Sequence, residues 1–159
     1  MIVKVICGAI IILSCSLIGI RLSESMHKRV RSISALLAAI GHIESCIRTV
    51  RMPLTEIYKT LSEKNGVIGE FFSKVVPGES WNKHIDVFSG LSPQDKTIIC
   101  NLSEKLGAYE TDRQLDEIGL TKKVLSDALE KAKKDVAENS RVYRSMSFFT
   151  GVVIAVLLI

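Results

Sequence analysis

The chain has 159 residues and a net charge of +4 at pH 7; 47% of its residues are apolar, 24% are charged and 6% are aromatic. This length suits one domain with a modest core, and a charged middle that is poor in aromatic residues is typical of helices rather than β-sheets. The basic clusters lack interleaved aromatic residues and any recognisable reader motif, so we expect no nucleic-acid partner. Four scattered cysteines argue against a disulfide framework, and we expect Cys46 and Cys100 to be buried thiols.

The two ends of the chain are its most apolar parts. Residues 5–20 and 145–159 contain no charged side chain. The first segment, extended to about 20 residues by snorkelling of its basic flanks, matches a hydrocarbon core about 30 Å thick. We therefore predict a transmembrane helix over residues 1–21, a helical bundle domain over residues 22–144 and a transmembrane helix over residues 145–159.

The first apolar segment has a second interpretation as a cleaved signal peptide. Lys4 would then be the basic start of the signal, and Ser23 and Ser25 would be the small residues at the cleavage site. Arg21 and Leu22 intrude between the apolar run and that site, and the helical pattern continues through it. We favour a transmembrane helix for this reason.

The C-terminal segment is short for a transmembrane helix. Its 15 residues rise only about 22 Å as an α-helix, so local thinning of the bilayer or packing against the first segment has to compensate. Small residues at helical spacing predict such packing, although chance in an apolar helix rich in small residues is the alternative. The predicted helix-packing residues are Cys15 and Gly19 in the first segment and Ser147, Gly151 and Ala155 in the second.

Basic residues lie beside both apolar segments. They are Arg21, Lys28, Arg29 and Arg31 after the first, and Arg141 and Arg144 before the second. The positive-inside rule then predicts that the middle of the chain faces the cytoplasm and that both termini lie on the other side; Lys4 opposes this. The same six residues would attract anionic headgroups by about 1 kcal/mol each, so membrane lipid is a predicted partner.

The first half of the middle region predicts two helices and a turn between them. Apolar residues recur at helical spacing over 22–50, so a long amphipathic helix continues from the first apolar segment. It should end near Met52, because Pro53 disfavours the helical conformation in the residue before it. Pro53 suits the start of a second helix over 54–61, which Gly66 closes.

The second half predicts four further helices. Two short apolar ones are expected over 67–76 and over 80–90. Ser92 as N-cap, Pro93 at the first helical position and Asp95 near the positive end of the dipole predict the start of the next helix. The last helix should begin between residues 112 and 121 and lead into the second apolar segment. The expected fold is thus all-α, a cytoplasmic bundle of about six helices between an N-terminal and a short C-terminal transmembrane helix.

The sequence contains no motif for catalysis. There is no phosphate-binding glycine loop and no nucleophile motif. His42 and Cys46 have the spacing of two metal ligands on a helix, but a zinc site needs more ligands and there is no second such pair. Asp116 and Glu117 are expected on different helix faces. We expect no catalytic residue, cofactor, metal or small-molecule substrate; an enzyme with an unrecognised site is the least favoured alternative.

Several strings resemble the stage III sporulation protein AB family. The most specific one, NSRVYRSMSFFTG over residues 139–151, resembles the family's Asn-x-Lys-Met-Tyr-Arg-Ser-Leu-Gly-Phe-x-x-Gly. Shorter matches are Ile43-Glu44, Met52-Pro53-Leu54 where the family has Thr-Pro-Leu, and Leu106-Gly107 followed by Gln114. The departures are Val30 for Pro, Arg141 for Lys and Ser147 for Gly. The resemblance extends over essentially the full chain.

This resemblance implies a function that the residues alone do not. It implies the six-helix fold of the cytoplasmic domain of type II secretion inner-membrane platform proteins. It also implies a place in the mother-cell membrane around the forespore, within the channel complex that links the two cells. The implied partners are the ATPase stage III sporulation protein AA and other proteins of that complex. The expected function is a non-enzymatic platform that docks the ATPase, and the alternative is a membrane-anchored helical signalling module.

Overall fold

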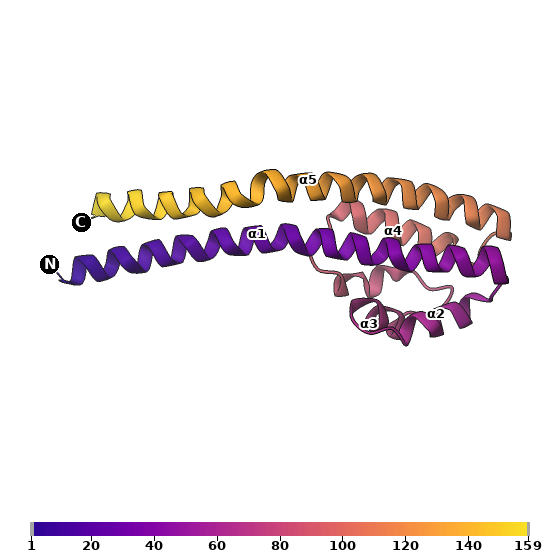
Figure 1. Ribbon diagram of the computed structural model, residues 1–159. Coiled ribbons are helices and arrows are strands. Elements are labelled where there is room, and N and C mark those ends of the chain that lie inside the picture. Colours follow the sequence, from indigo (N-terminus) through magenta and orange to yellow (C-terminus); the bar gives the residue numbers. More distant parts are fainter. Residues whose placement is uncertain (1, 159) are drawn as a thin grey trace. The chain divides into compact units, whose positions relative to one another are not determined.

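The computed structural model describes the backbone of residues 2–158, the side chains of residues 23–139 and scattered side chains in the two apolar ends. All regular structure in the described backbone is helical, which confirms the predicted all-α class. The α-helices in Figure 1 are α1 (Ile2–Ser45), α2 (Leu54–Ser62), α3 (Val67–Lys74), α4 (Pro93–Lys105) and α5 (Thr111–Leu158). A π-helical turn (Cys46–Val50) follows α1, and two 3-10 turns (Trp81–Lys83 and Ile85–Val87) precede α4.

The chain forms two compact units. Residues 1–28 and 131–159 make up the first, which we call the helix pair; in it the beginning of α1 and the end of α5 run alongside each other (Figure 1). Residues 29–130 make up the second, which we call the bundle. The described hydrophobic core lies almost entirely in the bundle, so the bundle positions the candidate sites.

The face of α1 that lies in the bundle forms the centre of its core. Ile33, Leu36, Ile40 and Ile43 are at most 1% exposed and recur at steps of three and four. Val50, expected to widen this stripe, is 62% exposed instead. It lies beyond the regular α-helix, in the π-helical turn, where the helical period no longer determines which side is buried.

One helical segment among the described residues is long and apolar enough to cross a membrane, and it is Ser23–Val50. Its most apolar side chains belong to the bundle core, which accounts for its hydropathy. The predicted transmembrane segments 5–20 and 145–159 are helical in backbone, but most of their side chains lie outside the described residues. Two membrane crossings therefore stay a prediction.

The turn between α1 and α2 follows the sequence prediction. Arg51 adopts a left-handed conformation with φ of 51°, and its N–H donates to the carbonyl of Cys46. Pro53 is extended and α2 begins at Leu54. The π-helical turn that continues α1 therefore ends at Arg51, a residue in the left-handed conformation, and Pro53 prevents further helix, as expected of a helix C-terminus.

An aromatic cluster fills the part of the bundle formed by α2, α3 and the two 3-10 turns. Its rings belong to Tyr58, Phe71, Phe72, Trp81 and Phe88, and most neighbouring pairs are edge to face. Phe71 lies 5.5 Å from Trp81 and 5.0 Å from Phe88 between ring centroids, a favourable geometry for aromatic rings. Burial raises the pKa of Tyr58 to about 12.

The helix predicted over 80–90 is wrong. The structure has two 3-10 turns there, and the residues before and after them are extended. Trp81, Ile85 and Phe88 are each 1% exposed, and the backbone N–H of Trp81 donates to the hydroxyl of Ser103 in α4 at 3.1 Å. The burial of these large side chains determines the backbone conformation of this segment, because a short segment gains little stability from helix propensity alone.

The long α5 helix begins at Thr111, one residue before the earliest predicted start, and it passes through Gly119 without a break. A Cβ built on Gly119 has no heavy atom within 4 Å. We predict that Gly119→Ala raises the free energy of unfolding by roughly 0.5–1 kcal/mol, because glycine loses more backbone freedom than alanine in a helix. Urea denaturation followed by the fluorescence of Trp81 measures this change, and a decrease would contradict the open surroundings of Gly119.

Candidate functional site

A cluster of polar side chains holds α1 against the start of α4. The carboxylate of Asp95, a residue only 2% exposed, accepts hydrogen bonds from Arg29 Nε at 2.9 Å and Arg29 Nη2 at 3.2 Å. It also accepts the Ser92 N–H at 3.0 Å, while the Ser92 hydroxyl accepts the Asp95 N–H at 3.1 Å. This capping box, with Pro93 at the start of the helix, confirms the predicted N-terminus of α4.

The environment of Asp95 favours its charged form. Burial by itself raises the pKa of this carboxyl, but the hydrogen bonds from Arg29 and Ser92 outweigh burial and hold its pKa below the usual value. A further hydrogen bond, from the Ser32 hydroxyl to the Ser89 carbonyl at 2.8 Å, ties the next turn of α1 to the same loop. We call Arg29, Ser32, Ser92 and Asp95 the polar clamp.

Arg29 was among the basic residues predicted to face the membrane, and the structure gives it a partner inside the bundle. Of the other predicted residues, the exposed ones are Arg21, Lys28 and Arg31. Lys28 pairs with Glu24 at 3.3 Å. The side chains of Arg141 and Arg144 lie outside the described residues. Lipid contact by all six residues, Arg29 included, stays a prediction.

The predicted helix-packing residues belong to the helix pair. They are Cys15, Gly19, Ser147, Gly151 and Ala155, and each has a helical backbone. Their side chains lie outside the described part of the structure. Close approach of α1 and α5 along this stripe therefore stays a prediction as well.

A second group of ion pairs lies in the bundle near the end of α1. Glu44 accepts from Lys122 at 2.6 Å and from Arg48 at 2.8 Å. The hydrogen bond from Lys122 is the main reason why the pKa of Glu44 is lowered. Glu117 pairs with Lys105 of α4 at 2.8 Å. These pairs connect α5 to α1 and to α4, so their role is structural.

The two residues with metal-ligand spacing are close together. Cys46 Sγ lies 3.7 Å from His42 Nε2, and burial, followed by the positive charge of Lys64, lowers the pKa of His42. No group of three or more possible metal ligands occurs among the residues that the structure describes. Cys46 and Cys100 are free and half-buried, which is less than the full burial expected of them. Two ligands alone do not make a zinc site.

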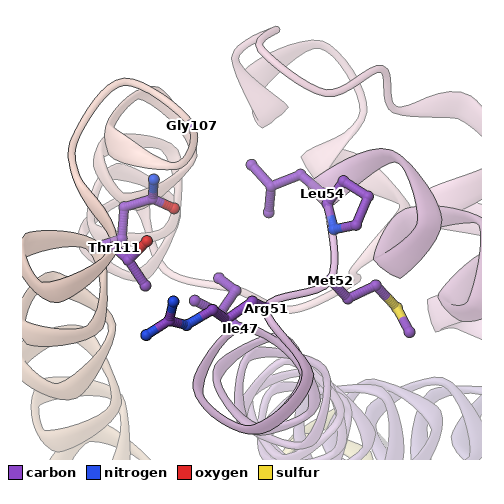
Figure 2. Close-up of a pocket in the computed structure, with 8 residues that line it drawn as sticks. Ile47, Arg51, Met52, Leu54, Gly107 and Thr111 are labelled. Carbon is purple, nitrogen blue, oxygen red and sulfur yellow. The ribbon is translucent and has the colours of Figure 1, made fainter.

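Two adjoining hollows open at the end of the bundle where α1 ends and α5 begins. The first has a volume of about 240 Å³, and Figure 2 shows Ile47, Arg51, Leu54 and Thr111 around it. The second has a volume of about 330 Å³ and lies between Pro77 and Glu104. Leu54 and Gly107 line both hollows, and we call the two hollows together the end groove.

The comparison with known families decides what kind of protein this is. The family model for stage III sporulation protein AB matches residues 4–159, nearly the whole chain. The chain belongs to the stage III sporulation protein AB family. No curated protein and no solved structure matches it. The family gives the chain a role in sporulation, and the match includes the apolar ends, the polar clamp and the end groove.

Sequence reasoning found some parts of these sites and missed others. It identified Ser92 and Asp95 as a helix start, and it placed Pro53 at a helix boundary that borders the end groove. It missed that Arg29 pairs with Asp95, because 66 positions separate them and neither residue carries a pattern that names its partner. It also missed the end groove, because the residues that line it come from three separate parts of the chain, 47–54, 77–78 and 104–114.

Proposed function

We propose that this chain is a non-enzymatic membrane platform of the channel complex between mother cell and forespore, and that it docks a cytoplasmic ATPase. The observation that carries the proposal is the family match over residues 4–159, which includes a helical bundle and both apolar ends. The family is one of sporulation proteins, and the chain contains no recognised catalytic motif.

The arrangement of the chain supports a two-helix anchor. Residues 1–28 and 131–159 form one compact unit, so both apolar ends belong to the same structural part. Two helices packed together would compensate for the short second segment, since helix packing within a bilayer stabilises marginal spans. In this proposal the anchor lies in the mother-cell membrane around the forespore.

The bundle is suited to the docking part of the proposal. Residues 29–130 form a compact unit of their own, with its own aromatic core and ion pairs. Basic residues next to both apolar segments favour a cytoplasmic location for this unit. A compact cytoplasmic domain held at the membrane surface by both of its ends is what a platform for a soluble ATPase requires.

Co-purification tests the docking proposal directly. The tagged full-length chain is extracted with detergent from membranes of sporulating cells, and the ATPase, stage III sporulation protein AA, is measured by quantitative mass spectrometry. We expect the ATPase to be enriched at least tenfold over a control extraction with an unrelated tagged membrane protein. Equal amounts in both extractions would contradict docking.

Cysteine labelling tests the topology separately. The exposed Glu79, in the loop after Pro77, is changed to Cys, while the four natural cysteines, Cys7, Cys15, Cys46 and Cys100, are changed to Ser. When the chain is produced in the plasma membrane of vegetative cells, we expect a membrane-impermeant maleimide to label this cysteine only after the cells are permeabilised. Labelling in intact cells would place the bundle on the other side of the membrane and would exclude a cytoplasmic ATPase as its partner.

A further inference from the structure

We infer that one face of the bundle, formed by α4 and α5, binds the same face of a second copy of the chain. The two helices form a hairpin, because only residues 106–110 join them (Figure 1). A hollow of about 170 Å³ lies between them. The exposed or half-buried residues that line it from α4 are Ile98, Asn101 and Lys105. Those that line it from α5 are Glu117, Leu120, Thr121 and Val124. We call these seven residues the hairpin face.

Large apolar side chains are exposed on the hairpin face. Leu120 is 62% exposed and Val124 is 46% exposed, and they lie about one turn apart on α5. The bundle core uses another side of this helix, where Ile118 and Leu125 are both 0% exposed. Ile98 lines the same hollow from α4 and is half-buried. The fold therefore leaves this apolar surface uncovered, which indicates an interaction surface.

The charges on the hairpin face cancel each other. Lys105 Nζ lies 2.8 Å from a carboxylate oxygen of Glu117, and the two side chains are 39% and 23% exposed. Both side chains can therefore meet a further partner. A strongly charged partner finds no net charge to complement here, whereas a second copy brings the same cation and the same anion. The electrostatics thus favour a second copy as the occupant.

The other residues of the hairpin face lie at matching heights on the two helices. Asn101 and Thr121 each lie four residues from the ion pair, and Ile98 and Val124 each lie seven residues from it. At a rise of 1.5 Å per residue, these steps are about 6 Å and about 10 Å on both helices. A residue of α4 therefore has a complement on α5 at each height: a charge for a charge, a hydroxyl for an amide, and an apolar side chain for an apolar one.

A two-fold axis that runs along the hairpin turns these matches into contacts between copies. It places α4 of one copy against α5 of the other and keeps every height, so the hairpin face is complementary to itself. Lys105 then meets Glu117 of the second copy, and Ile98 meets its Val124. The α5 helices of both copies also run in the same direction, as two chains anchored in one membrane require. This last step rests on the anchor of the proposed function; the face itself does not.

Disulfide cross-linking in membranes tests the inference. Two differently tagged full-length chains, with all four natural cysteines changed to Ser, are produced together. One chain carries Ile98→Cys and the other Val124→Cys, so that only contact between copies joins the two tags. With copper phenanthroline as the oxidant, we expect at least tenfold more linked product than from Ile98→Cys paired with Val76→Cys, a position 55% exposed outside the hairpin face. Equal yields would overturn the inference.

Charge exchange between copies tests the electrostatic part. If both cross-linking chains carry Lys105→Glu, four acidic side chains meet, and the yield should fall about fivefold. If one chain carries Lys105→Glu and the other Glu117→Lys, acidic residues meet basic ones again, and the yield should return to within about twofold. Both chains of this mixed pair lack the internal ion pair, so misfolding cannot explain the recovery. A mixed pair as weak as the acidic pair would contradict contact through this face.

The outcomes distinguish this inference from the proposed function. If the two tags are linked but the ATPase does not co-purify, the pairing of copies stands and docking of that ATPase fails. If the ATPase co-purifies but the tags are not linked above the Val76→Cys control, docking stands and the inference fails. If Ile98→Cys becomes linked to another protein instead of a second copy, the hairpin face has a different occupant and the inference is wrong.

Discussion

Replacing Asp95 by Ala is expected to lower the free energy of unfolding by about 3 kcal/mol. The substitution removes the partner of a half-buried guanidinium and also the reciprocal bonds of the capping box. The side chain of Arg29 is 27% exposed and keeps some contact with solvent. The decrease in the free energy of unfolding is therefore expected at the lower end of the range for broken buried ion pairs. Urea denaturation of the full chain in detergent, followed by the fluorescence of Trp81, measures the change.

A matched surface pair provides the control for Asp95. Asp86 pairs with Lys96, but its side chain is 79% exposed. Asp86→Ala should change the free energy of unfolding by less than about 0.5 kcal/mol, as is usual for exposed ion pairs. Equal effects of Asp86→Ala and Asp95→Ala would mean that the polar clamp is no stronger than a surface contact.

The polar clamp also makes the stability of the fold depend on pH. The pKa of Asp95 is lower in the folded chain than in the unfolded chain, so the clamp contributes fully above the unfolded value of about 3.9. Its contribution is lost as the pH falls through the lower, folded pKa. The unchanged chain should therefore lose stability below about pH 4 more steeply than Asp95→Asn. Equal slopes for the two proteins would show that Asp95 is not held in its charged form.

Gly69→Ala is the second substitution expected to have a large effect. A Cβ at this position would overlap the carbonyl oxygen of Lys64 and would lie 2.9 Å from the carbonyl carbon of the same residue. Backbone atoms cannot move aside as a flexible side chain does, so α3 would have to shift relative to the end of α2. We expect a loss of at least about 2 kcal/mol, even though alanine favours helices by about 1 kcal/mol over glycine.

The Gly119→Ala variant is the matched control for Gly69→Ala. Both substitutions add one methyl group within an α-helix, but only Gly69 has backbone atoms in the way. The two variants should therefore change the urea midpoint in opposite directions. If Gly69→Ala were as stable as the unchanged chain, α2 and α3 could not be packed as the structure has them.

The helix boundaries could largely be predicted from the sequence because they depend on local chemistry. Pro53 cannot continue the α1 helix, Ser92 and Asp95 satisfy the free N–H groups at the start of α4, and Gly107 takes a positive φ of 84° after it. Each of these effects involves residues a few positions apart. The family strings are local as well, and the match over residues 4–159 bears out the resemblance that they indicate.

Features that join distant parts of the chain were decided only by the tertiary structure. The segment around Trp81 adopts 3-10 turns because its side chains must fit among α2, α3 and α4, and this overrides a helical pattern. No local pattern around Gly69 indicates that the backbone of Lys64 lies beside it. The pairing of Arg29 with the buried carboxylate of Asp95 likewise joins two distant parts of the chain.

By itself, the sequence determined the all-helical class, most helix ends, the family and the apolar character of both ends, since composition, periodicity and capping act over short distances. The tertiary structure decided the polar clamp, the aromatic cluster and the end groove. These features depend on which surfaces meet after the chain turns back on itself. Those contacts are determined by the close packing of the whole core, which no local sequence pattern specifies.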